Sequence, residues 1–531
     1  MSVRDIVQAA AGVSTGNPNA WDISKAYYDP GADAGNVSKA IYSGISYSVS
    51  AQETAPRAVF FKPDGTKMYV YGATGDDVNE YNLSSPWLVS SASYVQNYVF
   101  AGEGQPGGLF FKPDGTKMYL IGQGFDRVDE FSLSTPWDVS TASSSADFSV
   151  SAQDTNPEDV FFKPDGTKMY VVGGAGVDIN EYDLSTAWDV SSASYVQNFS
   201  VSTNAPAPTS VSFLSDGTKM YVLSSFTNDE VVEYSLSTPW DVSSASYVQS
   251  FSVGSQETDP EGMFMKPDGS IFFVCGNTND RIYQYIIGGF SVASQETDPE
   301  ELFFKSDGTK MYVLGRSGDD VNEYDLSTAW DITTASYVQV FSVAAKDTFP
   351  TGMFFKGDGT KMYISGAGSS SVHEYNLSSA WDISSASFLQ SFSVSAKESN
   401  PNALSFKDDG TKMYVGGPGS DAVHEYDLST AWDISSASFL QSFSVAAQQT
   451  FLDGLAFKTD GTKMYTIGST EDEVNEYDLA TAWNISTASY VQLYKVLAAG
   501  PRGIFFRPNG EEFFIIDEQN DRIYKHSISP E

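Results

Sequence analysis

Short apolar segments alternate with glycine-containing turns along almost the whole chain, and the pattern returns about every 50 residues. In the first complete unit the apolar segments are residues 59–62, 66–71, 78–83 and 94–100. A Pro-Asp-Gly turn separates the first two segments, and a glycine-rich turn separates the second from the third. The segments are rich in β-branched and aromatic residues, and none has the 3.6-residue period of a helix. The pattern predicts four short antiparallel strands per unit.

The turn between the first two strands marks ten copies of this unit. The spacing of the copies is 49 to 52 residues, except for 39 between the fifth and sixth. A period of about 20–50 residues is typical of solenoids, propellers and arrays, and four strands per period are typical of a propeller blade. The sequence therefore predicts an all-β protein, a β-propeller of ten four-stranded repeats. The turn aspartate, once an asparagine, lies at Asp64, Asp114, Asp165, Asp216, Asp268, Asp307, Asp358, Asp409, Asp460 and Asn509.

Ring closure is indicated by the two ends of the chain. The tenth copy stops after its third strand, and the motif Asn19-Ala-Trp-Asp-Ile-Ser, followed by residues 46–50, matches the missing part. We expect this N-terminal strand to close a single ten-bladed ring, because closure removes exposed strand edges. Gly288-Gly289 predicts a two-residue hairpin within the fifth blade, which also favours one ring. The alternative is two five-bladed propellers, indicated by the recurrence of Asn279-Asp-Arg-Ile-Tyr as Asn520-Asp-Arg-Ile-Tyr.

Two recurrent residue types are assigned to the architecture. A lysine on the second strand and a glutamate on the third recur together, as Lys67 and Glu80 in the first copy, and both change in the fifth, to Ile271 and Gln284. This joint change predicts partners on neighbouring strands rather than catalytic acids. All nine tryptophans occupy one position in the excursion between the third and fourth strands. We interpret them as packing groups that anchor the excursion against the neighbouring blade.

Composition narrows the functional classes. The chain has 68 acidic and 30 basic residues, a net charge of −38, which disfavours binding to nucleic acid and to anionic membranes. No apolar run is long enough to span a membrane. One cysteine and three histidines leave little material for catalysis or metal clusters, and no nucleophile-elbow or phosphate-loop motif occurs. We therefore expect no enzyme, no catalytic residues and no cofactor, with calcium in the acidic loops as an alternative.

Residues that differ between the copies are the better candidates for recognition, because repeats are uniform where they build the fold. The turns between the second and third strands differ most from copy to copy. The candidate binding residues in these turns are Asp76, Asp77, Phe125, Asp126, Asp178, Phe226, Asn228, Arg316, Asp319 and Asp320.

The N-terminus carries a resemblance to a known group of proteins. Its first twelve residues, Met-Ser-Val-Arg-Asp-Ile-Val-Gln-Ala-Ala-Ala-Gly, resemble the N-termini of virion structural proteins from tailed marine bacteriophages. The units with Phe-Phe-Lys-Pro-Asp-Gly-Thr-Lys-Met-Tyr are similar to the propeller repeats of such phage proteins and of related bacterial ones. The resemblance implies docking onto other virion proteins through Arg4, Ile6 and Val7, with the propeller presented outward.

The resulting hypothesis is a non-enzymatic bacteriophage virion protein of the tail or a surface appendage, used in host attachment or particle stabilisation. Residues 1–45 are the docking segment with the ring-closing Trp21 motif, and residues 46–531 are the propeller. The expected location is the virion. The expected partners are other virion proteins and a host surface receptor or glycan, without nucleic acid or membrane insertion. Two alternatives stay open: a bacterial surface adhesin, and a propeller-type carbohydrate-active enzyme, which needs two carboxylates roughly 5–10 Å apart.

Overall fold

Ten antiparallel sheets make up the protein in a computed structural model that describes residues 17, 19–100, 105–124, 126–226 and 228–530. These residues form strands and single turns of 3₁₀ helix, and no α-helix. None of their helices has the length and hydropathy needed to cross a membrane. The all-β propeller of ten four-stranded repeats predicted from the sequence is confirmed.

The first blade shows how the repeat folds. It comprises β3 (Pro56–Phe61), β4 (Lys67–Gly72), β5 (Asp77–Leu83) and β6 (Ala92–Val99), paired in that order. In the turn after β3, Asp64 Oδ1 accepts hydrogen bonds from the Thr66 amide (3.0 Å) and hydroxyl (2.6 Å). Gly65 follows with φ +71°, and a Cβ there would collide with the Trp87 indole. The Asp-Gly-Thr motif is therefore required by the turn and by the tryptophan that covers it.

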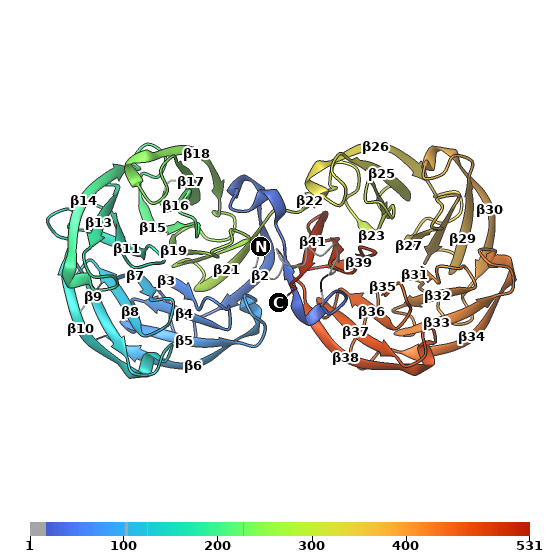
Figure 1. Cartoon of the computed structure of the whole chain (residues 1–531), viewed down its shortest axis with the longest axis horizontal. Helices are drawn as coiled ribbons and strands as arrows, with labels where there is room; N and C mark the ends of the chain where they lie inside the picture. The colour runs from blue at the N-terminus through green and yellow to red at the C-terminus, as the bar shows by residue number, and fades with distance from the viewer. Residues whose placement is uncertain (1–16, 18, 101–104, 125, 227, 531) are drawn as a thin grey trace, which may run out of the picture. The chain divides into compact units, whose positions relative to one another are not determined.

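Blades 1 to 5 form the first ring (Figure 1). The other four blades of this ring are blade 2, β7 (Pro106–Phe111), β8 (Lys117–Gly122), β9 (Arg127–Leu133) and β10 (Ala142–Ser149); blade 3, β11 (Pro157–Phe162), β12 (Lys168–Gly173), β13 (Asp178–Leu184) and β14 (Ala193–Ser200); blade 4, β15 (Pro208–Phe213), β16 (Lys219–Ser224), β17 (Glu230–Leu236) and β18 (Ala245–Ser252); and blade 5, β19 (Pro260–Met265), β20 (Ile271–Gly276), β21 (Arg281–Ile287) and β2 (Ala40–Ser48).

Blades 6 to 10 form the second ring (Figure 1). They are blade 6, β23 (Pro299–Phe304), β24 (Lys310–Gly315), β25 (Asp320–Leu326) and β26 (Ala335–Ser342); blade 7, β27 (Pro350–Phe355), β28 (Lys361–Gly366), β29 (Ser371–Leu377) and β30 (Ala386–Ser393); blade 8, β31 (Ala403–Phe406), β32 (Lys412–Gly417), β33 (Ala422–Leu428) and β34 (Ala437–Ser444); blade 9, β35 (Gly454–Phe457), β36 (Lys463–Gly468), β37 (Glu473–Leu479) and β38 (Ala488–Lys495); and blade 10, β39 (Pro501–Phe506), β40 (Glu512–Asp517) and β41 (Arg522–Ile528) with β1 (Ala26–Tyr28) and β22 (Phe290–Ser291).

Short 3₁₀ helices connect the third and fourth strands of most blades. An aspartate or asparagine caps nearly all of them, as Asp138 does by accepting from the Ser140 amide (3.0 Å). They are η1 (Ile23–Lys25), η3 (Val37–Lys39), η4 (Val89–Ser91), η5 (Val139–Thr141), η6 (Val190–Ser192), η7 (Val242–Ser244), η8 (Ile332–Thr334), η9 (Ile383–Ser385), η10 (Ile434–Ser436) and η11 (Ile485–Thr487), with η2 (Gly31–Asp33) in the N-terminal segment.

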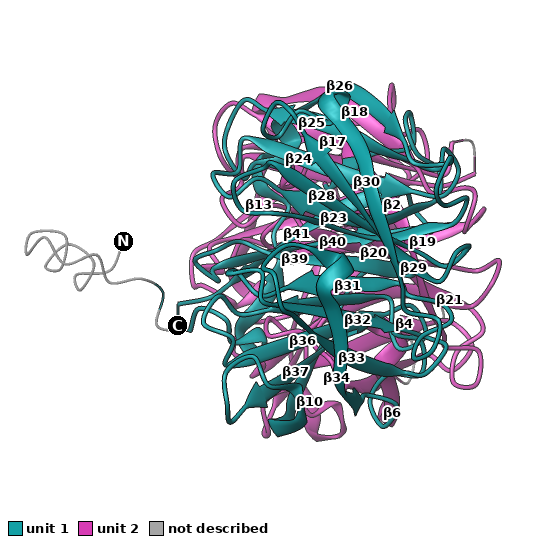
Figure 2. Ribbon diagram, turned by 90° about the vertical axis from the view of Figure 1, so that its right-hand side faces the viewer, with its two compact units in different colours: residues 1–32, 289–531 teal, residues 33–288 magenta. Residues whose placement is uncertain are grey.

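The repeats close into two five-bladed rings, so the single ten-bladed ring is wrong and the alternative is right. The first strand of blade 5 (β19) packs against that of blade 1 (β3), and β39 of blade 10 packs against β23 of blade 6. The chain accordingly separates into two compact units, residues 33–288 and residues 1–32 with 289–531 (Figure 2). Each unit completes its own circle, which removes the exposed edges of its inner strands.

Blade 10 obtains its outer strand from two separate segments. Ala26 of β1 pairs with Ile528 at one end of β41, and Phe290 of β22 pairs with Ile523 toward the other. The predicted closure by the Trp21 motif is thus confirmed, but residues 46–48 belong to blade 5. The predicted Gly288-Gly289 hairpin is wrong, because the strand after it joins β41 while β21 pairs with β2. Both glycines have positive φ, 102° and 79°, and form the junction where the chain leaves one unit and enters the next.

The N-terminus carries a second closing motif that the sequence analysis missed. Residues 33–42, Asp-Ala-Gly-Asn-Val-Ser-Lys-Ala-Ile-Tyr, follow the same pattern as residues 19–28, Asn-Ala-Trp-Asp-Ile-Ser-Lys-Ala-Tyr-Tyr. The Gly35 amide donates to the Gly269 carbonyl (2.8 Å), as the Trp21 amide does to that of Gly510 (2.9 Å). Each ring is therefore closed by its own copy of the motif. The copy that closes the first ring has Gly35 where the other has Trp21, which makes it hard to recognise in the sequence.

Tryptophan, as expected for a packing group, joins most blades to the next, and so does the glutamate of the third strand. The Trp137 carbonyl of blade 2 accepts from the Tyr69 hydroxyl of blade 1 (2.7 Å), and its indole stacks on Tyr69 at 6.3 Å. Glu80 forms the predicted ion pair with Lys67 through Oε1, and its Oε2 accepts from the Val139 amide of blade 2 (3.2 Å). The lysine–glutamate pair therefore also serves the contact between blades.

Candidate functional site at the channel mouths

The first strands of the five blades surround the axis of each ring, so equivalent residues of different blades meet there. The residue that follows the first-strand proline, which is replaced by Leu452 in blade 9, varies widely between the copies. It lies at the end of the channel beside the turns between the second and third strands. These mouth residues are Arg57, Gly107, Glu158, Thr209 and Glu261 in the first ring, and Glu300, Thr351, Asn402, Asp453 and Arg502 in the second.

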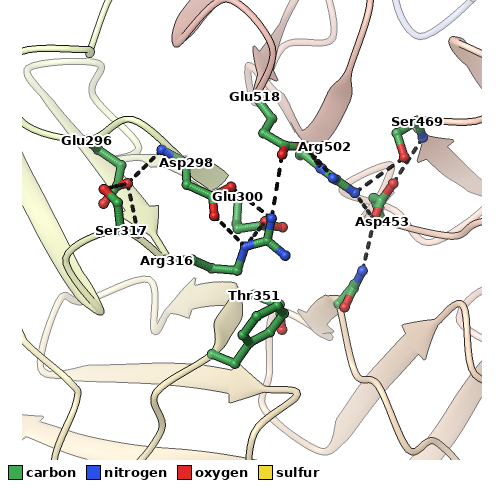
Figure 3. A network of polar contacts seen from close by, with 12 residues as sticks. Glu296, Asp298, Glu300, Arg316, Ser317, Thr351, Asp453, Ser469, Arg502 and Glu518 are labelled. Atoms are coloured by element: carbon green, nitrogen blue, oxygen red, sulfur yellow. Dashed lines mark hydrogen bonds and ion pairs between the residues drawn. The ribbon is translucent and has the colours of Figure 1, made fainter.

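Arg316 forms one half of an ionic network at the second mouth (Figure 3). The turn after β24 carries this residue. Its guanidinium contacts Asp298 through Nε (2.9 Å) and Nη2 (2.8 Å), and its Nε lies 2.6 Å from Glu300 Oε1. Phe349 packs its ring face 4.5 Å from the guanidinium carbon. Among the residues that the structure describes, none accepts a hydrogen bond from Nη1, so this nitrogen keeps two uncommitted donors.

Arg502 forms the other half of the network. Its Nη1 lies 3.0 Å from Asp453 Oδ1, and its Nη2 pairs with Glu518. Asp453 also accepts from Asn402 Nδ2 (2.8 Å), which holds the carboxylate in place. Glu518 Oε1 lies 3.6 Å from Arg316 Nη2. Glu518 thus links the two guanidiniums, which come from blades 6 and 10 (Figure 3).

Burial shifts the protonation of the carboxyl groups in this network. The Glu300 side chain is 2% exposed, and burial raises its pKa to about 8 against the opposing attraction of Arg316 and Arg502. Burial likewise raises the pKa of Asp453, again against Arg502. Glu518 is about one-third exposed. The second mouth therefore combines fixed cations, an accessible carboxylate and a carboxyl that holds a proton near neutral pH, an arrangement suited to acid–base chemistry.

The first ring has a similar but simpler mouth. Arg57 Nη1 lies 2.5 Å from Glu261, and burial raises the pKa of Glu261 to about 7. Glu158 accepts from the amide nitrogen of Gln123 (2.9 and 3.0 Å), and burial raises its pKa as well. The first mouth thus has one arginine where the second has two.

Three of the acidic candidates from the sequence serve turn geometry. Asp76, Asp126 and Asp319 lie between the second and third strands with φ of 46°, 50° and 48°. Aspartate tolerates this left-handed conformation better than most residues do, because its short side chain can bond locally. Aspartate therefore suits the turn conformation at these three positions.

Three further candidates begin the third strands and bond within their own blade. Asp77 accepts from Asn79 (2.6 Å) and Asn97 (2.5 Å), and Asp178 and Asp320 also accept from asparagines of their blades. Burial raises the pKa of all three, that of Asp320 to about 6. No group of three or more His, Cys, Asp or Glu side chains in the described ranges is arranged to hold a metal ion, and calcium in these loops stays a prediction.

The remaining candidates divide among three locations. Phe226 is 77% exposed, and Asn228 donates to Glu230 (2.9 Å) beside it. Phe125 and the docking residues Arg4, Ile6 and Val7 lie outside the described residues. Within the described part of the chain, Arg316 alone among the candidates contacts the mouth network.

Five residues of the network were not predicted from the sequence: Asp298, Glu300, Asp453, Arg502 and Glu518. A signal for two of the blades was present, because the residue after the first-strand proline is Glu300 in one copy and Arg502 in another. This strand position varies between the copies as the turns do, so variation marks it as a candidate for recognition as well.

The fold and the mouths define a β-propeller protein with polar groups gathered at the channel of each ring. The chain belongs to the family described as "Lactonase, 7-bladed beta-propeller", whose sequence profile matches residues 137–431, more than half of the chain. The match begins in blade 2 and ends in blade 8, so it follows the repeat through both five-bladed rings. No curated protein matches the chain.

Solved structures are also similar to this chain. The β-propeller domain of Cps50 (Swd1) from Myceliophteria thermophila has 11% identity and a TM-score of 0.27, over 70% of this chain and 95% of that one. A functionally unknown protein from Desulfotomaculum acetoxidans has 11% identity and a TM-score of 0.25, over 71% of this chain and 98% of that one.

The family match contradicts the expectation that the chain is not an enzyme, because the family is named for a hydrolase. That expectation came from the absence of linear catalytic motifs and the scarcity of histidine. A propeller, however, assembles its channel mouth from one or two residues of each blade, and these lie far apart in the sequence. A search for closely spaced motifs does not detect such a site.

Proposed function

We propose that the mouth of the second ring is a hydrolase site for a cyclic ester. The observation that carries the proposal is the meeting of Arg316, with uncommitted donors on Nη1, and the buried Glu300 carboxyl. The family match supports the reaction class, since a lactonase opens a lactone ring. The mouth of the second ring is favoured over the first because it brings two arginines to one place.

The network supplies a group for each part of the reaction. Arg316 would donate to the carbonyl oxygen, where negative charge develops in the transition state. Glu518 would accept a proton from the attacking water, and Glu300 would give its proton to the ring oxygen as the carbon–oxygen bond breaks. One water is consumed and one hydroxy acid is formed. The three groups lie at the same mouth, and Arg316 contacts the other two.

Ring opening of five- and six-membered lactones, including sugar lactones, tests the proposal by titration of the acid that is released. Arg316→Gln is expected to lower kcat/KM by about 100- to 1000-fold, the usual effect of removing one donor to an oxyanion. Arg57→Gln is the matched control, because Arg57 pairs with buried Glu261 at the other mouth. Turnover that is absent in the wild type, or equal in Arg316→Gln and the wild type, contradicts the proposal.

A second candidate function is a component of a bacteriophage particle that takes part in host attachment or particle stabilisation. The N-terminal resemblance supports it, as does a pair of exposed aromatic and aliphatic side chains that recurs on the outer strands. Recurrent apolar patches of this kind favour contact with other proteins. The pairs are Tyr94-Val95, Tyr195-Val196, Tyr247-Val248, Tyr337-Val338, Phe388-Leu389, Phe439-Leu440 and Tyr490-Val491.

Mass spectrometry of purified phage particles tests this second candidate. The chain should be present in particles, and Ile6→Asp should lower its incorporation without changing the thermal unfolding of the propeller. The matched control is Val99→Asp, a change at a 61% exposed side chain of β6 that lies outside the docking segment. Absence of the chain from wild-type particles contradicts the proposal.

A further inference from the structure

The channel of the second ring contains a larger cavity than the channel of the first ring. Its volume is about 110 Å³, against about 20 Å³ for the corresponding space in the first ring. The cause lies at one position of the first strand, where the first ring has four phenylalanines and one serine. The second ring has three phenylalanines and two small residues at this position, so the space of two phenyl groups is left unfilled. The residues at this position are Phe60, Phe110, Phe161, Ser212 and Phe264, and then Phe303, Phe354, Ser405, Ala456 and Phe505.

A buried carboxyl group lines the second-ring cavity. Glu301 is 4% exposed, and its Oε1 accepts from the Leu302 amide (2.9 Å). Among the described residues none donates to Oε2. The neighbouring strand makes room for the side chain with Gly503, where a Cβ would collide with Oε1. Glu301 therefore presents to the open space an oxygen that has no donor among the described residues.

The first ring supplies the contrast. Its central carboxyl, Asp159, is fully bonded: Oδ2 accepts from the Ser210 hydroxyl (2.6 Å) and the Val211 amide (3.0 Å), and Oδ1 accepts from the Val160 amide (2.8 Å). Asp159 thus completes a packed core, whereas Glu301 does not. The difference in bonding coincides with the difference in cavity volume.

The rest of the cavity lining suits a cation. It contains six phenylalanine rings, the Trp483 indole and the Ser405 hydroxyl, which makes no hydrogen bond with a described residue. The lining includes no lysine, arginine or histidine. Asp408 and Thr459 are exposed and also line the space, so it reaches the face formed by the turns between first and second strands. A ligand can therefore enter from this face, opposite to the mouth network, past an acidic side chain.

We propose that this cavity binds a small alkylammonium ion, with Glu301 as its counter-ion and the faces of Phe303, Phe354 and Phe505 around its alkyl groups. Aromatic faces attract such cations, most strongly where water is excluded. A 150 Å³ cavity that holds benzene allots roughly 25 Å³ to each heavy atom, so 110 Å³ admits about four heavy atoms. Trimethylammonium has that size and one N–H to donate to Oε2. This inference does not rest on the proposed lactone hydrolysis.

Binding is expected to depend on pH. Burial raises the pKa of Glu301 well above its usual value, and the nearby acidic groups Glu300 and Asp453 raise it further. Asp408 faces the same cavity from the exposed side. The empty site therefore holds a neutral carboxyl, and its proton passes to solvent when the cation binds. Affinity should rise by up to about tenfold per pH unit below the pKa of Glu301.

Titration of the full chain with trimethylammonium chloride, followed by calorimetry and ligand-observed NMR, tests the proposal. Glu301→Gln should weaken binding by about 10- to 100-fold and abolish its pH dependence, because a charge-assisted hydrogen bond is lost. Ala456→Phe gives the second ring four phenylalanines at this position, as many as the first ring has, and should abolish binding while keeping the carboxyl. Asp159→Asn is the matched control at the other central carboxyl, and its affinity should equal that of the wild type.

Three results would overturn the proposal. The first is no binding of trimethylammonium by the wild type at 100 mM, roughly the weakest affinity that a single desolvated cation–π contact would give. The second is equal binding of neutral tert-butyl alcohol, which would indicate selection by shape alone. The third is unchanged binding in a folded Ala456→Phe variant, which would place the ligand elsewhere.

Discussion

Trp21→Ala is expected to release the N-terminal segment from blade 10 while the other blades stay folded. Trp21 is 6% exposed, and its indole stacks on Phe506 at 5.2 Å and on Tyr465 at 6.3 Å. Its backbone bonds to Gly510 and Tyr465 survive the substitution, so the loss is that of the indole. Truncation of a buried tryptophan costs about 3–5 kcal/mol.

Amide hydrogen exchange measures this release directly. Local opening that becomes easier by about 3–5 kcal/mol accelerates exchange by roughly 100- to several thousand-fold, since 1.4 kcal/mol corresponds to a factor of ten. The faster exchange should appear in β1 (26–28) and in the paired end of β41 (526–528), because Trp21 stabilises the hydrogen-bonded pairing of these two segments.

The matched control is Trp188→Ala, which removes the same side chain from blade 3. Trp188 stacks on Phe162 at 5.7 Å, and its carbonyl accepts from Tyr119 (2.8 Å). The segment that carries Trp188 is continuous with strands on both sides. The substitution should therefore destabilise the first ring without affecting β1. Exchange in β1 that stays within tenfold of the wild type in Trp21→Ala would refute the reasoning.

Two further predictions concern stability. Burial lowers the pKa of His526 to about 3, and the unfolded imidazole titrates near pH 6.5, so unfolding takes up a proton between these values. The free energy of unfolding should therefore fall as pH drops from 6.5, by up to about 1.4 kcal/mol per pH unit. When this free energy is measured by urea titration at several pH values, its slope against pH should be shallower for His526→Tyr than for the wild type. Equal slopes would argue against this explanation. Lys310→Ile leaves Glu323, whose side chain is 2% exposed, without its cation and should cost about 2–3 kcal/mol. Adding Glu323→Gln copies the natural Ile271 and Gln284 of blade 5 and should recover most of the loss, whereas a double variant as unstable as the single one would exclude this explanation.

The blade could be predicted from sequence because its determinants are local. The turn at Asp64 and Gly65 and the alternation of strands lie within about 45 residues, and each copy repeats them. The partnership of Lys67 with Glu80 was readable for the same reason, since blade 5 changes both residues together. Ten copies gave ten independent observations of one local structure.

The candidate site was predicted poorly because its members are distant in sequence. Glu300, Asp453 and Arg502 belong to three blades and meet because the first strands converge on the ring axis. The turn residues chosen as candidates proved, as Asp76 and Asp77 show, to be fixed largely by the geometry of the turn and by bonds within the blade. Arg316 was the exception, since its turn lies beside the channel.

The sequence by itself determined the ten blades, the tryptophan anchors and the closure of blade 10 by the Trp21 motif, because turns, strand periods and adjacent-strand pairs are short-range. Only the tertiary structure decided that five blades complete a circle, because that number depends on how neighbouring sheets pack and not on any one repeat. It also decided which variable residues share a mouth, and that the absence of two phenylalanine rings leaves a cavity beside Glu301. Side chains from separate blades converge only after the ring has closed.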